Sequence, residues 1–363
     1  MNKEVISDKQ GIFIIVMFIM GTSTMLVTGL EAKKDLWLAD ILAIIMAVPV
    51  LGIYARLHYI FPNKDLFDML VLCFGKFIGK GIGILYVWFT LHLSSLILMN
   101  IGDFITISAL SETPKEVVKL FTSILAIWIV KEGIEVMSRW SDFFLPFMVV
   151  GIVLTILLLM TKIELNNIKP LLYEGMSPVF KGAFEAFSFP FAETVVFTMA
   201  FCKFRRKNSP YKIYLLGLFV GGILILSIST IDILVLGVNN ASSLYFPSYS
   251  TVSKIDIGDF VQRLEIIAAV MFMLGAFLKF SICLMATTKG ITKVLGYKGY
   301  RFMVIPIALI ILSLASIVHD NIMDLIEWDQ SIWPYYAFLF QVVFPMLIFI
   351  VAEFKRKYGK LKT

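Results

Sequence analysis

The chain alternates long apolar runs with short polar connections from one end to the other. A helix needs about 20 apolar residues to cross the hydrocarbon core of a bilayer, and many of these runs approach that length. No connection is long enough to fold by itself, so we interpret 1–363 as a single transmembrane domain. The pattern predicts about ten membrane-spanning helices, near 11–30, 37–60, 81–107, 117–131, 143–161, 178–202, 213–238, 261–288, 302–318 and 332–352.

Composition supports this interpretation and excludes a water-soluble globular protein. Hydrophobic residues make up 59% of the 363 positions and charged residues 16%, and the mean hydropathy is +0.88. A soluble domain has roughly 45–50% apolar and about 25% charged residues. The three cysteines, Cys73, Cys202 and Cys283, lie far apart without metal-ligand spacing, so we expect neither a metal nor a cofactor.

Lys and Arg gather in alternate connections, beginning with the N-terminal tail. Cytoplasmic connections carry such an excess, which predicts an even number of spans with both termini in the cytoplasm. The connection 319–333 is the complement, with four acidic residues and no Lys or Arg. Basic blocks such as 203–207 fit anchors beside anionic membrane lipid, so the net charge of +6 does not indicate a nucleic-acid partner.

Two predicted spans are interrupted at their centres. Gly21, Thr22, Ser23 and Thr24 break the first, and Pro190 breaks the sixth within Phe-Ser-Phe-Pro-Phe. The breaks match if the chain consists of two five-helix repeats, near 11–161 and 178–352, and matched breaks indicate a binding site at the bilayer midplane. The alternative is close helix packing at the small residues and a structural kink at the proline.

Lys279 is the main candidate for function among the charged residues inside the spans. A buried cation in the membrane needs a partner or water. Lys279 therefore fits a site for a ligand carboxylate or for proton coupling, or else a structural ion pair or a snorkelling side chain. Glu193, just after the second break, is its expected carboxylate partner and a candidate for coupling or gating; the alternative is a helix cap.

Three further positions have weaker signals. His92 in the third span fits a cavity wall or a proton shuttle, or else a packed core residue. Asp103 fits a wet or gating position near the outer end. Arg263 and Glu265, at the start of the eighth span, are predicted to make structural ion pairs that tie that end to its neighbours. The sequence contains no nucleophile elbow, zinc-protease or nucleotide-binding motif, so we do not expect an enzyme.

Several short segments together resemble one family. They are Lys-Pro-Leu-Leu-Tyr-Glu-Gly at 169–175, Phe-Ser-Phe-Pro-Phe-Ala-Glu at 187–193 and Gln-Arg-Leu-Glu at 262–265, supported by Ser-Glu-Thr-Pro at 111–114 and the break at Gly21. Across nearly its whole length the chain resembles the B subunit of the spore-germination nutrient receptors, a permease family similar to amino acid–polyamine–organocation transporters. The resemblance implies an all-α membrane protein with ten helices in a five-plus-five inverted repeat of the LeuT type, with helices one and six discontinuous.

The resemblance also implies a site for a small nutrient, usually an amino acid, between spans one, three, six and eight. Carried over position by position, the ligand-binding residues are Gly21, Thr22, Ser23, Phe89, His92, Leu93, Ser188, Phe189, Pro190, Lys279 and Cys283, with Phe191 as a gate. Other members carry a small polar residue or Tyr at the last two binding positions. Lys279 therefore argues against simple alanine recognition, because its cation can meet a carboxylate or replace a coupling sodium ion.

Two functions fit this resemblance. In the first, the chain is a nutrient sensor of the spore inner membrane that signals to the A and C subunits of a germinant receptor. In the second, it is a secondary transporter that moves an amino acid with protons. Both use the same pocket, so the sequence does not separate them.

Overall fold

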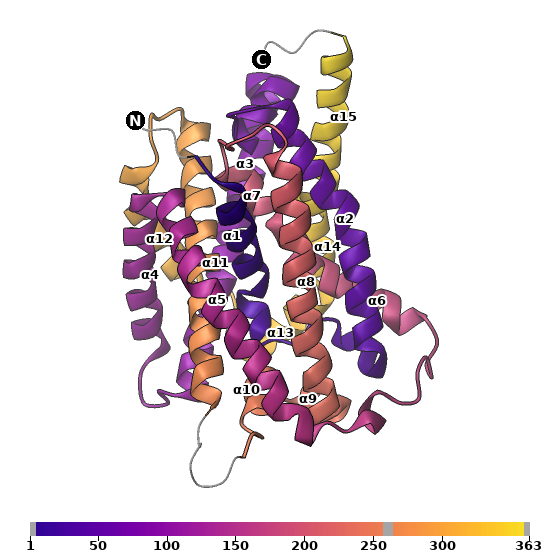
Figure 1. Cartoon of the computed structure of the whole chain (residues 1–363). Coiled ribbons are helices and arrows are strands. Elements are labelled where there is room, and N and C mark those ends of the chain that lie inside the picture. The colour runs from indigo at the N-terminus through magenta and orange to yellow at the C-terminus, as the bar shows by residue number, and fades with distance from the viewer. Residues whose placement is uncertain (1–4, 257–263, 359–363) are drawn as a thin grey trace.

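The computed structural model describes residues 5–256 and 264–358, and within them the fold is helical with no β-sheet. The helices run roughly parallel to one axis as a bundle, and α1 (Asp8–Met20) begins at the end where α15 (Phe344–Lys357) finishes (Figure 1). This arrangement places both ends of the described chain on the same side of the bundle.

The helices follow the ten predicted spans in order. Six helical segments are long and apolar enough to cross a membrane, and they correspond to the second, third, fifth, seventh, eighth and tenth predicted spans. The traversals are α1 with η1 (Thr22–Thr24); α2 (Leu36–Ile60); α3 (Leu66–Ser108); α4 (Lys115–Glu132); α5 (Ile134–Leu159); α6 (Ser177–Ala186) with η5 (Phe187–Phe191), η6 (Ala192–Val195) and α7 (Val196–Ala200); α8 (Ser209–Leu236); α11 (Glu265–Leu295); α12 (Val304–Leu314); and α14 (Trp333–Phe338) with η8 (Leu339–Val343) and α15.

Several boundaries differ from those predicted. The third span begins at Leu66 rather than near 81, because the side chain of Asp65 caps the helix by accepting from the amide of Asp68. Gly75, with φ 81°, turns the chain inside this segment, where a side chain would be strained. The ninth span, formed by α12 (Val304–Leu314), ends several residues before the predicted boundary at 318.

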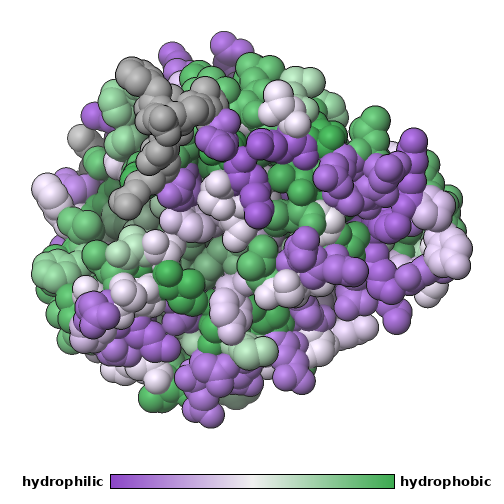
Figure 2. All heavy atoms as spheres, turned by 90° about the horizontal axis from the view of Figure 1, so that it is seen from below, coloured by the Kyte–Doolittle hydropathy of each residue, from purple (hydrophilic) through white to green (hydrophobic). Residues whose placement is uncertain are grey.

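Three short helices lie in connections for which the sequence pattern predicts no helix. They are α9 (Val238–Ser243), α10 (Pro247–Val252) and α13 (Ile322–Ser331). They gather at the end of the bundle opposite the start of α1 (Figure 1). Figure 2 views this end face, where hydrophilic side chains collect over the apolar bundle.

Helix α1 is the centre of the bundle. Its residues from Ile14 to Met20 are fully buried, and it packs against α8, α5 and α11. The outer surface carries exposed apolar side chains such as Phe77, Trp128 and Phe143. An apolar exterior around a fully buried central helix is the arrangement expected of a helical bundle in lipid.

Both predicted breaks are present. Helix α1 ends at Gly21 and continues as the short turn η1, while the sixth span unwinds at Phe189, whose φ of −133° and ψ of 116° are extended. Pro190 lacks an amide and cannot continue the helical hydrogen bonds. The two broken segments lie against each other, with the rings of Phe18 and Phe197 5.0 Å apart.

Candidate ligand-binding site

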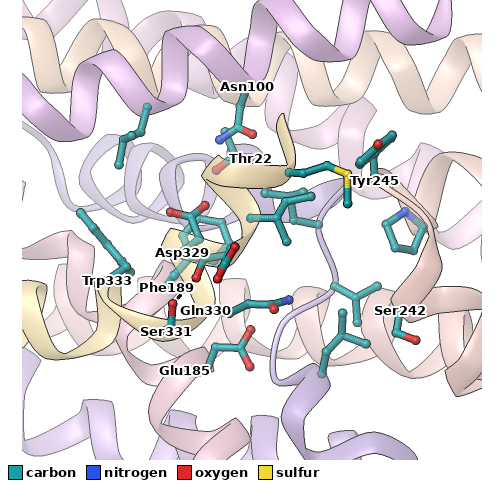
Figure 3. A pocket seen from close by; sticks show the side chains of 18 of the residues that line it. Thr22, Asn100, Glu185, Phe189, Ser242, Tyr245, Asp329, Gln330, Ser331 and Trp333 are labelled. Atoms are coloured by element: carbon teal, nitrogen blue, oxygen red, sulfur yellow. Dashed lines mark hydrogen bonds between the residues drawn. The ribbon is translucent and has the colours of Figure 1, made fainter. Parts of the chain in front are cut away.

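A cavity of about 620 Å³ lies between the broken first span, α3, the broken sixth span, α11 and α13. Trp333 and Tyr245 stand on opposite sides of it, and Thr22 and Asn100 lie across from Glu185 and Gln330 (Figure 3). Exposed residues such as Ser242 and Glu327 also line it. The cavity therefore extends from the middle of the bundle toward the end that carries α9, α10 and α13.

A buried ion pair forms the deep end of this cavity. Lys279 Nζ lies 2.5 Å from Glu193 Oε2, and the two side chains are 0% and 1% exposed. The ammonium group also donates to Thr22 Oγ1 at 3.3 Å. It lies 4.5 Å from the ring centroid of Phe189 and 5.3 Å from that of Phe18. Coulombic, hydrogen-bond and cation–π interactions together satisfy a charge that would otherwise be very costly in the membrane.

Two glycines allow α11 to reach this point. A Cβ atom on Gly275 would lie 3.2 Å from the Cα of Gly21, so α11 crosses the first span at its break. Lys279 follows Gly275 by four residues and therefore projects from the same face of the helix. A Cβ atom on Gly21 would lie 2.6 Å from Cδ of Lys279. The lysine stem occupies the space that the missing side chain leaves.

Five of the residues predicted from the sequence line the cavity. They are Thr22, Leu93, Phe189, Glu193 and Lys279. They come from the first, third, sixth and eighth spans, which the resemblance named. The structure also places Glu193 against Lys279, as expected from the need of a buried cation for a carboxylate.

Other predicted binding residues lie beside the cavity rather than in its wall. His92 packs among Trp88, Trp328 and Tyr336 with ring centroids 5.0–5.8 Å away. Phe89 stacks on Phe340 at 4.7 Å. These two residues therefore contribute to an aromatic cluster between α3 and the tenth span, and they support the cavity from behind.

The polar residues at the two breaks mainly satisfy backbone groups. Ser23 donates to the carbonyls of Ile19 and Met20. Ser188 Oγ donates to Gln341 Oε1 at 3.3 Å, and Gln341 Nε2 donates to the Ser188 carbonyl at 2.9 Å. The broken backbone is thus held by neighbouring side chains, which is what irregular structure within a membrane requires.

The remaining predicted residues have other surroundings. Pro190, Phe191 and Cys283 are buried in the core and do not line the cavity. Asp103 is 5% exposed, and its Oδ1 lies 3.4 Å from Lys115 Nζ. Arg263 lies outside the described residues, and Glu265 is the first residue of α11.

Several cavity residues were not selected from the sequence. Asn100 lies on α3, Glu185 on α6, Asp329 on α13, and Trp333 begins α14. The clearest sequence signal for these residues is the acidic connection 319–333. Its helix α13 folds back over the bundle and places Asp329 at the cavity. Glu185 was visible as a second carboxylate in the sixth span.

Asp329 is the carboxylate of α13 that faces the deep end. Burial raises the pKa of Asp329 to about 8, and the nearby carboxylates of Glu193 and Glu185 add to this shift while Lys279 opposes it. Desolvation and like charge both favour the neutral form of a carboxyl group. The protonation of Asp329 is therefore sensitive to any cation that enters the cavity.

Comparison with known structures identifies the fold. The chain superposes on a solved structure of Mhp1, a nucleobase-cation-symport-1 family transporter in a closed conformation with bromovinylhydantoin bound, with a TM-score of 0.71. The match covers 99% of this chain and 79% of the transporter at 12% sequence identity. The predicted ten-helix LeuT-type architecture with discontinuous first and sixth helices is confirmed.

Sequence comparison identifies the relatives. The chain is 27% identical to spore germination protein KB of Bacillus subtilis (strain 168), over 98% of this chain and 97% of the relative. It is 23% identical to spore germination protein YndE of the same organism, over 91% and 90%. It is also 23% identical to spore germination protein XB of Bacillus anthracis, over 69% and 70%. The profile of the spore permease family, described as spore germination protein, matches residues 5–324. The chain belongs to this spore germination family of membrane proteins.

Proposed function

We propose that this chain is the nutrient-binding membrane subunit of a spore germinant receptor. A small nutrient, of the amino acid class, binds in the cavity between the two broken spans. Binding shifts the helix bundle between two conformations, and the shift signals germination. The names of the relatives support the biological setting, and the cavity supports the binding step.

The single observation that carries the proposal is the Lys279–Glu193 pair at the deep end of the cavity. An amino acid carries the same two charges as this pair. Its carboxylate can take the place of Glu193 beside Lys279, and its ammonium group can take the place of Lys279 beside Glu193. A ligand that exchanges partners with a buried pair binds one arrangement of the surrounding helices better than another, and so shifts their population.

Membership of the spore germination family supports a cellular setting for this proposal. We place the chain in the spore inner membrane, surrounded by lipid, with both termini on the core side. Its partners are the A and C subunits of the receptor. In this orientation the cavity faces away from the spore core, which is the side from which an external nutrient arrives.

A proton-coupled amino acid transporter is the second candidate. The transporter-like fold favours it, and the carboxylates of Glu193 and Asp329 close to the cavity offer groups that can carry a proton. A transporter needs the cavity to open alternately toward both sides of the membrane. A sensor needs access from one side.

Two measurements test the proposal. Spores that carry Lys279→Ala should lose the nutrient response while spores with the wild-type chain germinate, as followed by dipicolinic acid release. Purified wild-type chain in proteoliposomes should bind nutrient without accumulating it. A normal response from Lys279→Ala spores with normal protein levels would refute the site, and proton-driven uptake by the chain alone would favour the transporter.

A further inference from the structure

The charged residues that line the cavity are almost all acidic. Among the described residues, its wall contains five carboxylates and a single ammonium group. The carboxylates are those of Glu31, Glu185, Glu193, Glu327 and Asp329, and the ammonium group is that of Lys279.

The one cation is already neutralised. Lys279 is fully buried and its charge is compensated by Glu193 at 2.5 Å. The pair leaves four carboxyl groups of the described wall without a neighbouring cation in that wall. Lys33, which is close in sequence to Glu31, instead contacts both carboxylate oxygens of Glu174, at 2.7 and 2.8 Å. Its charge is therefore directed away from the cavity.

The acidic groups come from three different parts of the chain. Glu31 follows the first span, Glu185 precedes the break in the sixth, and Asp329 lies on α13. Asp329 interacts electrostatically with both Glu193 and Glu185, and Glu185 interacts with Glu31. Glu185 and Asp329 extend toward the same open space (Figure 3). Separate elements thus bring carboxyl groups together, and ionising them all at once costs energy unless a cation enters.

Two polar atoms of the wall also lack partners. Glu185 Oε2 and Trp333 Nε1 are buried and have no hydrogen-bond partner among the described residues. Trp333 is 3% exposed and lines the cavity. A buried polar atom without a partner is costly unless a ligand or water completes it. Glu185 Oε2 can accept a hydrogen bond from a ligand, and Trp333 Nε1 can donate one.

We propose that the cavity selects a small organic molecule with a net positive charge, whose ammonium group binds among Glu185, Asp329 and Glu31. This inference rests on the proposed function, because it names the chemical class of the nutrient. Tyr245 adds an aromatic ring to the cavity wall, and aromatic rings attract cations. A basic amino acid or a diamine has this chemistry. An acidic molecule of the same size finds Lys279 already paired with Glu193, so it gains no opposite charge in the cavity wall and is disfavoured.

Three amino acids of similar shape provide the test. L-lysine, L-norleucine and L-2-aminoadipate present a positive, a neutral and a negative side chain, and cadaverine presents two ammonium groups without a carboxylate. Binding of each is measured by calorimetry to the purified full chain in lipid nanodiscs. We expect lysine and cadaverine to bind at least about tenfold more tightly than norleucine, and aminoadipate more weakly than norleucine.

Variants that remove single charges identify which carboxyl groups produce the preference for a cation. Glu185→Gln and Asp329→Asn keep the shape of each side chain, and each should weaken lysine binding by about tenfold with little effect on norleucine. Glu112→Gln, in an exposed connection outside the cavity, is the matched control and should leave all affinities unchanged. The melting temperature of each variant without ligand verifies folding.

The outcomes separate this inference from the proposed function. Norleucine or aminoadipate binding as tightly as lysine, with binding blocked by Leu93→Trp, would overturn the charge selection and leave the nutrient site in place. Failure of all four probes to bind the folded chain would also overturn the charge selection. The proposed function is then judged independently by the Lys279→Ala germination test, which requires no knowledge of ligand charge.

Discussion

The two ends of the helix bundle differ in packing and in charge. At the end where α1 begins, Lys293 Nζ lies 2.6 Å from Asp68 Oδ1 and 3.3 Å from Asp65 Oδ2. Lys289 Nζ donates to the carbonyl of Ala200 at 2.8 Å, which ties α11 to the end of α7. Phe201 is fully buried there. The opposite end is hollow, and acidic residues line the hollow.

The packed end and the open cavity together define one conformational state of the helix bundle. Apolar packing and ion pairs close one end, and the cavity extends toward the other, so the proposed ligand would enter from a single side. For a sensor this state is sufficient for binding, whereas a transporter must also open the closed end. Perturbing each end separately therefore distinguishes binding from alternating access.

The largest expected effect comes from the buried pair between the two ends. Lys279→Ala leaves the Glu193 carboxylate buried without its partner, which costs about 3–5 kcal/mol of stability. Thermal unfolding in nanodiscs measures this loss. Lys33→Ala removes an ion pair whose side chains are 54% and 48% exposed, and it should cost less than about 1 kcal/mol.

A double variant separates stability from ligand response. Lys279→Met combined with Glu193→Gln removes both charges and should recover most of the lost stability, because no unpaired charge remains. The ligand response should stay absent. Equal stability of Lys279→Ala and the wild type would show that the pair does not hold the spans together.

A smaller effect is expected where α11 crosses the first break. Gly21→Ala places a Cβ atom 2.6 Å from Lys279 Cδ and 2.7 Å from the Phe18 carbonyl oxygen. The backbone oxygen cannot easily move, so the substitution should cost about 1–3 kcal/mol and weaken ligand binding. Gly52→Ala on α2 is the matched control, because nothing lies within 4 Å of its added Cβ. Equal melting temperatures for the two variants would contradict the close crossing.

The acidic end should make binding of a cation depend on pH. Because burial raises the pKa of Asp329 to about 8, this group holds a proton in the free folded protein at lower pH, and a bound cation displaces that proton. Affinity for lysine should therefore rise by up to about tenfold per unit as the pH increases toward about 8, and then level off. Calorimetry between pH 6 and pH 9 measures the profile. Asp329→Asn should flatten it, and a pH-independent wild type would contradict this role.

The same shift has a consequence for stability, with a defined sign. A pKa that is higher in the folded than in the unfolded state favours folding at low pH, and that contribution is lost as the pH rises through about 8. Without ligand, the melting temperature of the wild type should decline between about pH 6 and pH 8 more than that of Asp329→Asn.

The smallest effect is expected at the closed end. The Lys293 side chain is 42% exposed, so its ion pairs with Asp65 and Asp68 contribute less than about 1 kcal/mol each. Lys293→Gln should weaken the closure and raise the rate of maleimide labelling at the half-buried Cys202 by a few fold. Lys64→Gln, at an exposed position, is the control. An unchanged labelling rate would show that these ion pairs do not control access.

Much of the fold was predictable because the membrane imposes strong constraints. Long apolar runs identified the spans, and Gly21 and Pro190 identified the breaks. The partner of Lys279 was also predictable, because a lone cation in the membrane needs a carboxylate and Glu193 followed the second break. These inferences depend on solvation and local backbone chemistry, and both follow from the residue types and their order in the chain.

The rest depended on contacts between distant segments. His92 and Phe89 share an aromatic cluster with Trp328 and Phe340, and no spacing in the sequence brings these residues together. Half of the residues of helix α13 are polar, so counting apolar spans does not predict its fold back over the cavity. The predicted boundaries of the two repeats, 11–161 and 178–352, and the binding roles of the individual residues remain predictions.

Filling the cavity tests whether the nutrient binds between the two broken spans. Leu93→Trp adds a large side chain to the α3 wall of the cavity, while Leu85→Trp adds the same side chain to an exposed position of the same helix. Calorimetry with both variants in nanodiscs uses a nutrient to which the wild-type spores respond. Leu93→Trp should lose binding while Leu85→Trp binds like the wild type, with both variants folded. Undiminished binding by folded Leu93→Trp would show that the nutrient does not bind in this cavity.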